Sequence, residues 1–166
     1  MTTERLDLRA VSPSDVDDLF AITSDPQTWR HNPELVHREP ARTADWISRA
    51  AARWDSDGLS YWLVRVGDAV VGIGGVQRQS TGNWNLYYRF APSAWGNGYA
   101  TELGRAAIAA ARSVDDGMPV IAWISPDNPE SIAVAERLGL HRSGMHPDPS
   151  DGRMRIAFAD RPLATL

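Results

Sequence analysis

The chain contains no cysteine and no lysine, and it has no long apolar run. Without cysteine the protein has no disulfide, no thiolate-based zinc site and no thiol nucleophile. The absence of lysine makes arginine the source of all 17 basic side chains, which we attribute to codon composition rather than to function. No stretch approaches the roughly 20 apolar residues that a membrane span needs, so we expect no membrane partner.

Positive charge is also in short supply, because the formal net charge is −4. A protein that neutralises nucleic-acid phosphates needs a basic surface, so we expect no DNA partner. The first residues show neither the basic nor the apolar region of a secretory signal, which favours the cytoplasm. With hydrophobic residues at 43% of the chain, we predict one globular domain over residues 1–166, and no spacing of side chains indicates a metal site.

Periodicity predicts a mixed α/β fold. Alternating apolar and charged residues predict a first strand at 6–10, and Ser12-Pro13-Ser14-Asp15 has the pattern of a helix start. Further strands are predicted at 60–66, 69–77, 84–91, 119–125, 140–144 and 153–159, with helices at 43–54, 101–113 and 128–139. The order is β-α-α-β-β-β-α-β-α-β-β, with an antiparallel meander in its middle, and it is not that of a doubly wound sheet.

The most informative segment joins the meander to an alanine-rich helix, and it reads Trp95-Gly96-Asn97-Gly98-Tyr99-Ala100-Thr101-Glu102. Backbone N–H groups at such a turn are unpaired and converge, and the dipole of the following helix adds partial positive charge. Glycine lets the backbone approach an anion closely and take a positive φ. The segment therefore indicates a phosphate site, although many ordinary turns share its two glycines.

A second motif, Asn128-Pro129-Glu130-Ser131, follows the strand at 119–125 and opens the last helix. Taken alone, it is an ordinary helix N-cap. Its distance after the glycine turn, with one strand between them, favours a functional role.

The element order and the two motifs resemble the GCN5-related N-acetyltransferase superfamily over nearly the whole chain. The chain is most similar to the branch that includes bacterial acetyltransferases of ribosomal-protein N-termini. Members of that branch commonly begin with Thr-Glu-Arg-Leu and carry Trp-Gly-x-Gly-Tyr-x-Thr-Glu, which here are residues 3–6 and 95–102. The resemblance implies a central, mixed but mostly antiparallel sheet of about seven strands, splayed between the fourth and the fifth and flanked by about four helices.

The resemblance also implies roles in binding acetyl-CoA. The amides from Gly96 to Thr101 would cradle the pyrophosphate. Trp95 stands where the superfamily's signature usually has Arg or Gln, so we expect backbone amides to carry this binding. The signature residues are Trp95, Gly96, Asn97, Gly98, Tyr99 and Ala100.

The strand before the glycine turn would bind the pantetheine arm through the backbone of Tyr88, Arg89 and Phe90, as an added strand pairs with a sheet edge. In the superfamily this strand separates from the strand at 119–125, and a bulge near residues 89–90 would be consistent with that split. By the same resemblance Asn128 bonds the pantetheine, and Ser131 protonates or hydrogen-bonds the departing thiolate. The oxyanion donor is expected to be a backbone N–H near Phe90.

The general base is not identified by any motif. Residues 83–91 contain no acid, although some relatives carry a glutamate there. Glu102 falls in the first turn of its helix, where we expect it beside the phosphates as a partner of the dipole. His31 and His37 lie in the loop that lines the acceptor cleft in this superfamily, but a loop histidine is more often solvated than catalytic.

A proton can also leave through a water chain held by Tyr87, Tyr88 or Trp123. His141 and His146 are expected to be structural. The sequence therefore does not identify the general base.

The leading hypothesis is an acetyl-CoA-dependent N-acetyltransferase that works through a ternary complex. Its acceptor is a primary amine, either a protein or peptide N-terminus or a small molecule, and no motif within residues 25–58 decides between them. The alternative is a non-catalytic acyl-CoA-binding or regulatory module. A dinucleotide-binding oxidoreductase is disfavoured, because its fingerprint needs a third glycine where Thr101 stands. Homodimers are common in the superfamily, so the resemblance suggests a second copy as a partner.

Overall fold

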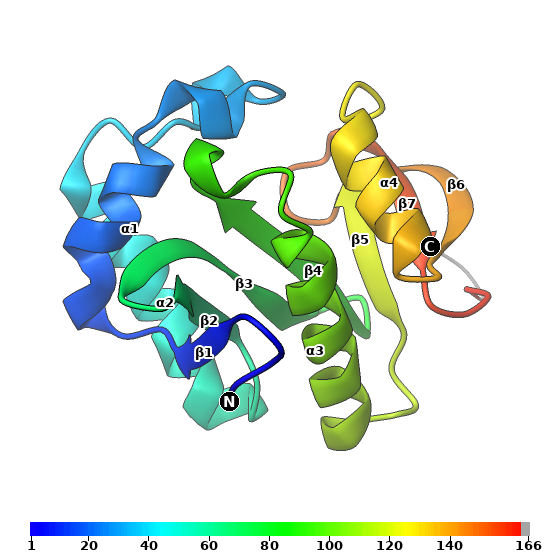
Figure 1. Cartoon of the computed structure of the whole chain (residues 1–166). Helices are drawn as coiled ribbons and strands as arrows, with labels where there is room; N and C mark the ends of the chain where they lie inside the picture. Colours follow the sequence, from blue (N-terminus) through cyan, green and yellow to red (C-terminus); the bar gives the residue numbers. More distant parts are fainter. Residues whose placement is uncertain (164–166) are drawn as a thin grey trace.

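The structure is a computed structural model that describes residues 1–163; the last three residues of the predicted 1–166 domain lie outside the described part. Within it, seven strands and four α-helices follow the predicted order (Figure 1). The strands are β1 (Asp7–Ala10), β2 (Tyr61–Val66), β3 (Ala69–Gln79), β4 (Asn83–Phe90), β5 (Val120–Ile124), β6 (His141–Pro147) and β7 (Met154–Ala159). The helices are α1 (Val16–Thr23), α2 (Pro40–Asp57), α3 (Tyr99–Val114) and α4 (Pro129–Arg137).

The strands form one sheet in the order β1-β2-β3-β4-β5-β7-β6. All neighbouring pairs are antiparallel except β4 and β5. This parallel pair joins only Trp84 to Val120 and Asn85 to Ile121, and beyond it the two strands diverge (Figure 1). The predicted fold, with its sheet splayed between the fourth and the fifth strand, is confirmed.

The splay occurs without a bulge near residues 89–90. The pairing of β3 with β4 runs without a shift from the Gly72–Phe90 pair to the Gln79–Asn83 pair. Meanwhile β5 stays paired with β7 along its length. The sheet opens because each of the two strands keeps its outer neighbour once the inner pairing stops.

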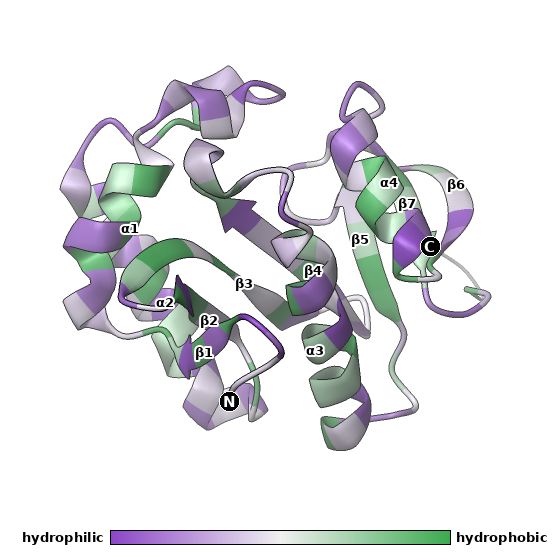
Figure 2. Cartoon of the chain, in the orientation of Figure 1, coloured by the Kyte–Doolittle hydropathy of each residue, from purple (hydrophilic) through white to green (hydrophobic). Residues whose placement is uncertain are grey.

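The helices cover the two faces of the sheet in pairs. Buried side chains of α1 and α2 pack with Leu63 and Ile73 on one face, and those of α3 and α4 pack with Trp84 and Phe90 on the other. Figure 2 shows hydrophobic residues along β5 and on parts of the helices, whereas the loops at the open end of the split are largely hydrophilic. Because side chains alternate along β4, Tyr87 joins the first face and its neighbours Tyr88 and Leu86 the second.

Two helices start earlier than their sequence patterns predicted. α2 begins at Pro40 rather than near 43, because proline fits the first position of a helix. α3 begins at Tyr99, directly after Gly98 in the left-handed conformation. The loop between α1 and α2 contains two short 3₁₀ turns, η2 (Pro26–Trp29) and η3 (Pro33–Leu35). Across residues 1–163, no helix is both long and apolar enough to cross a membrane.

Candidate active site

Two cavities meet where β4 and β5 separate. A groove of about 1030 Å³ runs past the glycine turn and between the first turns of α3 and α4. A pocket of about 140 Å³ lies between the ends of β4 and β5. The residues that line both cavities are Tyr88, Arg89, Asn128, Ser131 and Val134. A molecule in the groove and another in the pocket would therefore meet at these side chains, which we call the junction.

The glycine turn presents a run of unused backbone donors to the groove. Gly96 and Gly98 have φ angles of 77° and 78°, in the left-handed region that favours glycine. Among residues 1–163, no acceptor bonds the consecutive N–H groups from Gly96 to Ala100, and the first bonded amide is that of Thr101, 3.1 Å from the Gly98 carbonyl. Donors in this arrangement at the N-terminus of α3 suit an anion with several oxygens. The Thr101 amide, predicted as part of the cradle, is already occupied.

Two side chains of the turn brace its shape. The indole N–H of Trp95 donates to the Phe90 carbonyl at 3.0 Å, which fastens the turn to the end of β4. The amide group of Asn97 donates to the carbonyls of Ala94 and Trp95, both at 3.1 Å. These bonds hold the backbone that carries the open donors, so the two side chains position the turn and leave its amides available.

The free edge of β4 exposes the peptide groups of alternate residues. The Ala91 N–H bonds a β3 carbonyl at 2.9 Å, and the antiparallel pattern therefore directs the peptide groups of Arg89 at β3 as well. The peptide groups of Tyr88 and Phe90 consequently face the split. Since Trp95 occupies the Phe90 carbonyl, both groups of Tyr88 and the N–H of Phe90 stay available. Arg89 differs from its two predicted companions, because it offers its side chain rather than its backbone.

The N-terminus of α4 places Asn128 and Ser131 at the junction. The Asn128 Oδ1 accepts the Ser131 N–H at 3.0 Å, so the residue is an N-cap, while its amide N–H groups have no acceptor within residues 1–163. The N-cap interpretation and the cofactor interpretation are therefore compatible. Burial raises the pKa of Tyr88 to about 12, against the opposing effect of the nearby Ser131 hydroxyl. Tyr88 consequently keeps its phenolic proton at neutral pH.

Five arginines line the groove: Arg5, Arg30, Arg89, Arg105 and Arg137. Arg30 lies 2.6 Å from Glu130 and its guanidinium stands 4.7 Å from the centre of the Trp95 ring, so it spans from the α1–α2 loop to α4. Arg105 and Arg137 project from α3 and α4 without a carboxylate partner in the part of the chain that the structure describes. The groove therefore combines open amides with positive charge.

Glu102 lies in the first turn of α3, but it does not line the groove or the pocket. Its Oε1 accepts the Thr3 hydroxyl at 2.5 Å and the Arg5 N–H at 2.7 Å, and Oε2 lies 2.8 Å from the Arg5 guanidinium. Burial opposes its ionisation, but the bonds from Thr3 and Arg5 outweigh this and hold the pKa of Glu102 below its usual value. Glu102 therefore anchors the N-terminal segment against α3.

Arg89 stands on the opposite side of β4 from α3. Its guanidinium lies 3.3 Å from the centre of the Trp29 ring in η2. Its Nε donates to the Tyr87 hydroxyl at 2.8 Å, and one Nη1 proton bonds the Thr28 carbonyl. The side chain is half-buried and fixed in direction, which gives the junction a positive charge on its α1–α2 side.

His37 is a core residue rather than a solvated one. It is 5% exposed, its Nδ1 lies 2.8 Å from the Thr43 hydroxyl, and its ring stacks on Trp29 at 5.4 Å. Burial, with the charges of Arg42 and Arg89, lowers the pKa of His37 to about 4. The ring therefore stays neutral and serves the packing of the α1–α2 loop.

His31 lines the groove, in contact with the start of α4. Its Nδ1 lies 3.5 Å from Asp127, and its Nε2 accepts the Arg30 Nε–H at 3.0 Å. The lone pair that a general base would need is thus already engaged. In this arrangement His31 and His37 are both held by neighbouring side chains.

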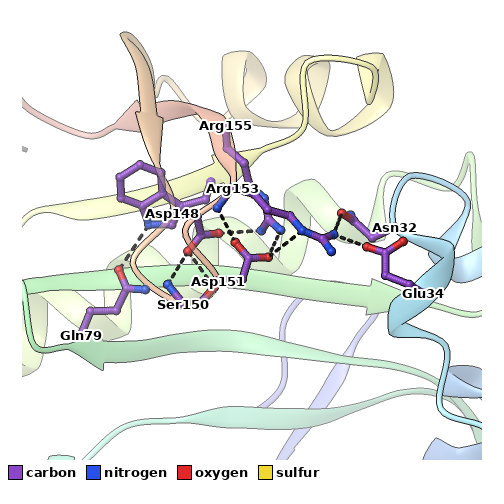
Figure 3. A network of polar contacts seen from close by, with 9 residues as sticks. Asn32, Glu34, Gln79, Asp148, Ser150, Asp151, Arg153 and Arg155 are labelled. Carbon is purple, nitrogen blue, oxygen red and sulfur yellow. Dashed lines mark hydrogen bonds and ion pairs between the residues drawn. The ribbon is translucent and has the colours of Figure 1, made fainter.

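A polar network closes the far wall of the pocket (Figure 3). Arg153 in the segment between β6 and β7 bonds Asn32 and Glu34 of the α1–α2 loop. Arg155 lines the pocket and lies 2.5 Å from both Asp148 and Asp151. The network joins two segments that are more than 100 positions apart, and it neutralises the charge of Arg155 (Figure 3).

Several residues of the site carried no sequence signal. Arg30, Arg105, Arg137 and Arg155 belong to no motif, and their placement depends on contacts across the fold. A sequence signal did exist for the side chain of Arg89. Because β4 contains no acidic residue, Arg89 is the charged side chain of that strand.

Comparison with known proteins gives a consistent picture. The family model described as "Acetyltransferase (GNAT) domain" matches residues 5–141. An uncharacterised protein of Bacillus subtilis, YkkB, is 30% identical over an alignment of 149 positions that covers 86% of this chain and 86% of that protein.

Solved structures share the fold at lower identity. A GNAT-family acetyltransferase from Bacillus anthracis is 21% identical, with a TM-score of 0.79 and 96% of each chain covered. RimL, a ribosomal L7/L12 α-N-protein acetyltransferase solved with coenzyme A, is 17% identical, with a TM-score of 0.79 over 96% of this chain and 95% of that one.

Proposed function

Because this chain belongs to the GNAT family of acetyltransferases, an N-acetyltransferase family that uses acetyl-CoA, we propose that it transfers the acetyl group directly to a primary amine. The amine belongs to a small molecule or to a peptide N-terminus. The observation that carries the proposal is the junction, where a groove suited to the cofactor opens onto a separate pocket.

The groove fits acetyl-CoA in both size and chemistry. Its volume of about 1030 Å³ lies at the upper end of the range of small-molecule sites. The open amides from Gly96 to Ala100 match the oxygens of a pyrophosphate, and Arg105 and Arg137 supply charge for further phosphate. The peptide groups of Tyr88 can pair with the amides of the pantetheine arm, as a strand pairs with a sheet edge.

The reaction needs no covalent intermediate with the protein. The lone pair of the neutral amine forms the new C–N bond with the thioester carbonyl carbon, the C–S bond breaks, and its electron pair leaves on sulfur. In this proposal the Phe90 N–H stabilises the oxyanion, and the Ser131 hydroxyl protonates the sulfur. One proton leaves the nitrogen and one reaches the thiol, so atoms and charge balance.

The proton on nitrogen has no side-chain base to receive it among the described residues of the junction. His31 is engaged by Arg30, and His37 is buried behind Trp29. Water in the pocket is then the acceptor, with the hydroxyl of Tyr87 or Tyr88 holding it. A cation such as Arg89 beside the amine assists this loss, because a like charge lowers the pKa of an ammonium.

The test measures acetyl-CoA binding and free CoA release separately. We expect micromolar binding of acetyl-CoA, and CoA release with at least one member of a panel of primary amines and short peptides. Binding without turnover on any amine, even at alkaline pH, would instead support the non-catalytic module. Absence of binding would overturn both functions.

A further inference from the structure

Arg89 carries a charge that no carboxylate of the described residues pairs. Of the five N–H donors of a guanidinium, two are used, one by the Tyr87 hydroxyl and one by the Thr28 carbonyl. Neither partner is charged, and no carboxylate of residues 1–163 lies within ion-pair distance of this side chain. Half-buried charges are normally paired, so a fixed cation with unused donors suits an anion from outside the chain.

The side chain is aimed at the acceptor side of the junction. Strand alternation places Arg89 on the α1–α2 face together with Tyr87, and from there its side chain lines the pocket as well as the groove. Stacking on Trp29 and the bond to Tyr87 fix the plane of the guanidinium. Arg89 is thus oriented before any ligand arrives, which is what bidentate recognition of a carboxylate requires.

The remaining pocket wall is poor in negative charge. None of the residues within 1–163 that line the 140 Å³ pocket is acidic. The other lining cation, Arg155, is neutralised by Asp148 and Asp151. A second ammonium group, as in a polyamine, would therefore find no partner in the pocket and would be repelled by Arg89.

The size of the pocket limits the acceptor as well. A protein cavity of 150 Å³ binds benzene, which has six non-hydrogen atoms, so a pocket of about 140 Å³ admits a group of similar size. A small amino acid meets that limit.

The geometry points to an acceptor that carries a carboxylate close to its primary amine, with Arg89 as the residue that binds this carboxylate. This inference rests on the acetyl transfer proposed above and specifies its substrate class. The chemistry is that of a free amino acid, and an acidic first side chain of a peptide presents it too. Arg89 is a specificity-determining residue in this assignment.

The first experiment compares L-alanine with L-alaninamide as acceptors for the whole protein, with release of CoA as the signal. The two differ in the carboxylate, and the amide has the less basic amine, so intrinsic reactivity at neutral pH favours the amide. We expect the wild type to prefer alanine by about 10- to 100-fold in kcat/KM, the range of one charge-assisted contact. Equal use of both acceptors, or faster use of a diamine, would overturn the inference.

Variants assign the preference to Arg89. Arg89→Gln should remove the preference for alanine while leaving the KM for acetyl-CoA unchanged, and Arg89→Lys should retain part of it. Tyr87→Phe keeps the charge but removes the acceptor that orients it, so a smaller loss is expected. Arg49→Gln, at an exposed position of α2, is the matched control. A raised KM for acetyl-CoA in Arg89→Gln, with the acceptor preference intact, would reassign this arginine to the cofactor.

Two further experiments distinguish a free amino acid from a peptide as the source of the carboxylate, and a failure of this inference from a failure of the proposed function. Tripeptides that begin with Asp or Glu, compared with Asn or Gln, show whether a peptide supplies the carboxylate. If no amine is acetylated, the proposed function fails for these acceptors. Binding of a carboxylate at Arg89 is then measured without turnover. In the presence of CoA, N-acetylalanine should raise the Tm of the wild type but not of Arg89→Gln, and no shift in either protein would overturn the inference.

Discussion

The two sides of the junction are built in different ways. On the cofactor side, the glycine turn, α3 and α4 present backbone groups that follow from local sequence, such as the open amides from Gly96 to Ala100. On the acceptor side, the α1–α2 loop and the β6–β7 segment present side chains that are held by partners far along the chain. Arg89 and Thr28, for example, are 61 positions apart. A binding site made of backbone groups can therefore be predicted from a sequence motif. A site whose side chains come from distant parts of the chain can be identified only from the folded structure.

The largest effect is expected from a substitution in the glycine turn, where backbone amides form the cofactor side of the junction. Gly96→Val should weaken acetyl-CoA binding by roughly 100-fold or more, because the side chain enters the space beside the open amides and at least two charge-assisted bonds are lost. Isothermal titration measures the Kd. Gly82→Val is the matched control, since Gly82 has a similar φ of 79° and equally open space around its Cβ, but lies in the β3–β4 turn. Equal effects of the two substitutions would show that backbone strain, and not the cradle, explains the loss.

Ser131 tests whether the junction is catalytic. Ser131→Ala should lower kcat about 100-fold at neutral pH with little change in the KM for acetyl-CoA, because only the proton donor for the thiolate is removed. Stopped assays of CoA release give both constants. Ser113→Ala, at an exposed position near the end of α3, should behave as the wild type. A rise in KM with kcat unchanged would make Ser131 a binding residue.

Acid should weaken the acceptor side through His37. The folded protein holds the pKa of His37 at about 4, below its usual 6.5, so protons bind the unfolded chain more readily. The stabilisation is complete above pH 6.5 and is lost as the pH falls toward 4. It amounts to about 2 kcal/mol between pH 7 and pH 5.

Urea unfolding of the wild type and of His37→Gln at these two pH values measures this contribution. The variant should lose about 2 kcal/mol less of its free energy of unfolding on acidification. His141→Gln, at an exposed position, should follow the wild type. Parallel losses in wild type and His37→Gln would assign the acid sensitivity to the carboxylates instead.

The smallest effect is expected at the polar network of the pocket wall. Arg153→Gln removes the bonds to Asn32 and Glu34, but exposed ion pairs contribute only about 0–1 kcal/mol. The KM for the acceptor should rise by no more than about threefold, with the Kd for acetyl-CoA unchanged. Arg142→Gln on β6 serves as control. A larger change in the acetyl-CoA Kd than in the acceptor KM would show that the polar network supports the cofactor side rather than the acceptor side of the junction.

Sequence patterns predicted the part of the protein that local physics determines. The order of the elements, the glycine turn and the Asn128 cap follow from periodicity and capping preferences. The contact between Glu102 and Arg5 could not be predicted in this way, because the two residues are 97 positions apart. The burial of His37 was missed for a different reason: its partners Trp29 and Thr43 are near in sequence, but they enclose it only when the α1–α2 loop folds back on itself.

The central claim is that acetyl-CoA lies on the open amides of the glycine turn. Hydrogen exchange of the backbone from Gly96 to Ala100, measured with and without saturating acetyl-CoA, tests it directly. These amides have no acceptor within residues 1–163, so they should exchange rapidly in the free protein and become protected in the complex, together with the Tyr88 amide. Unchanged exchange of the glycine turn at saturation, with protection elsewhere, would contradict the account.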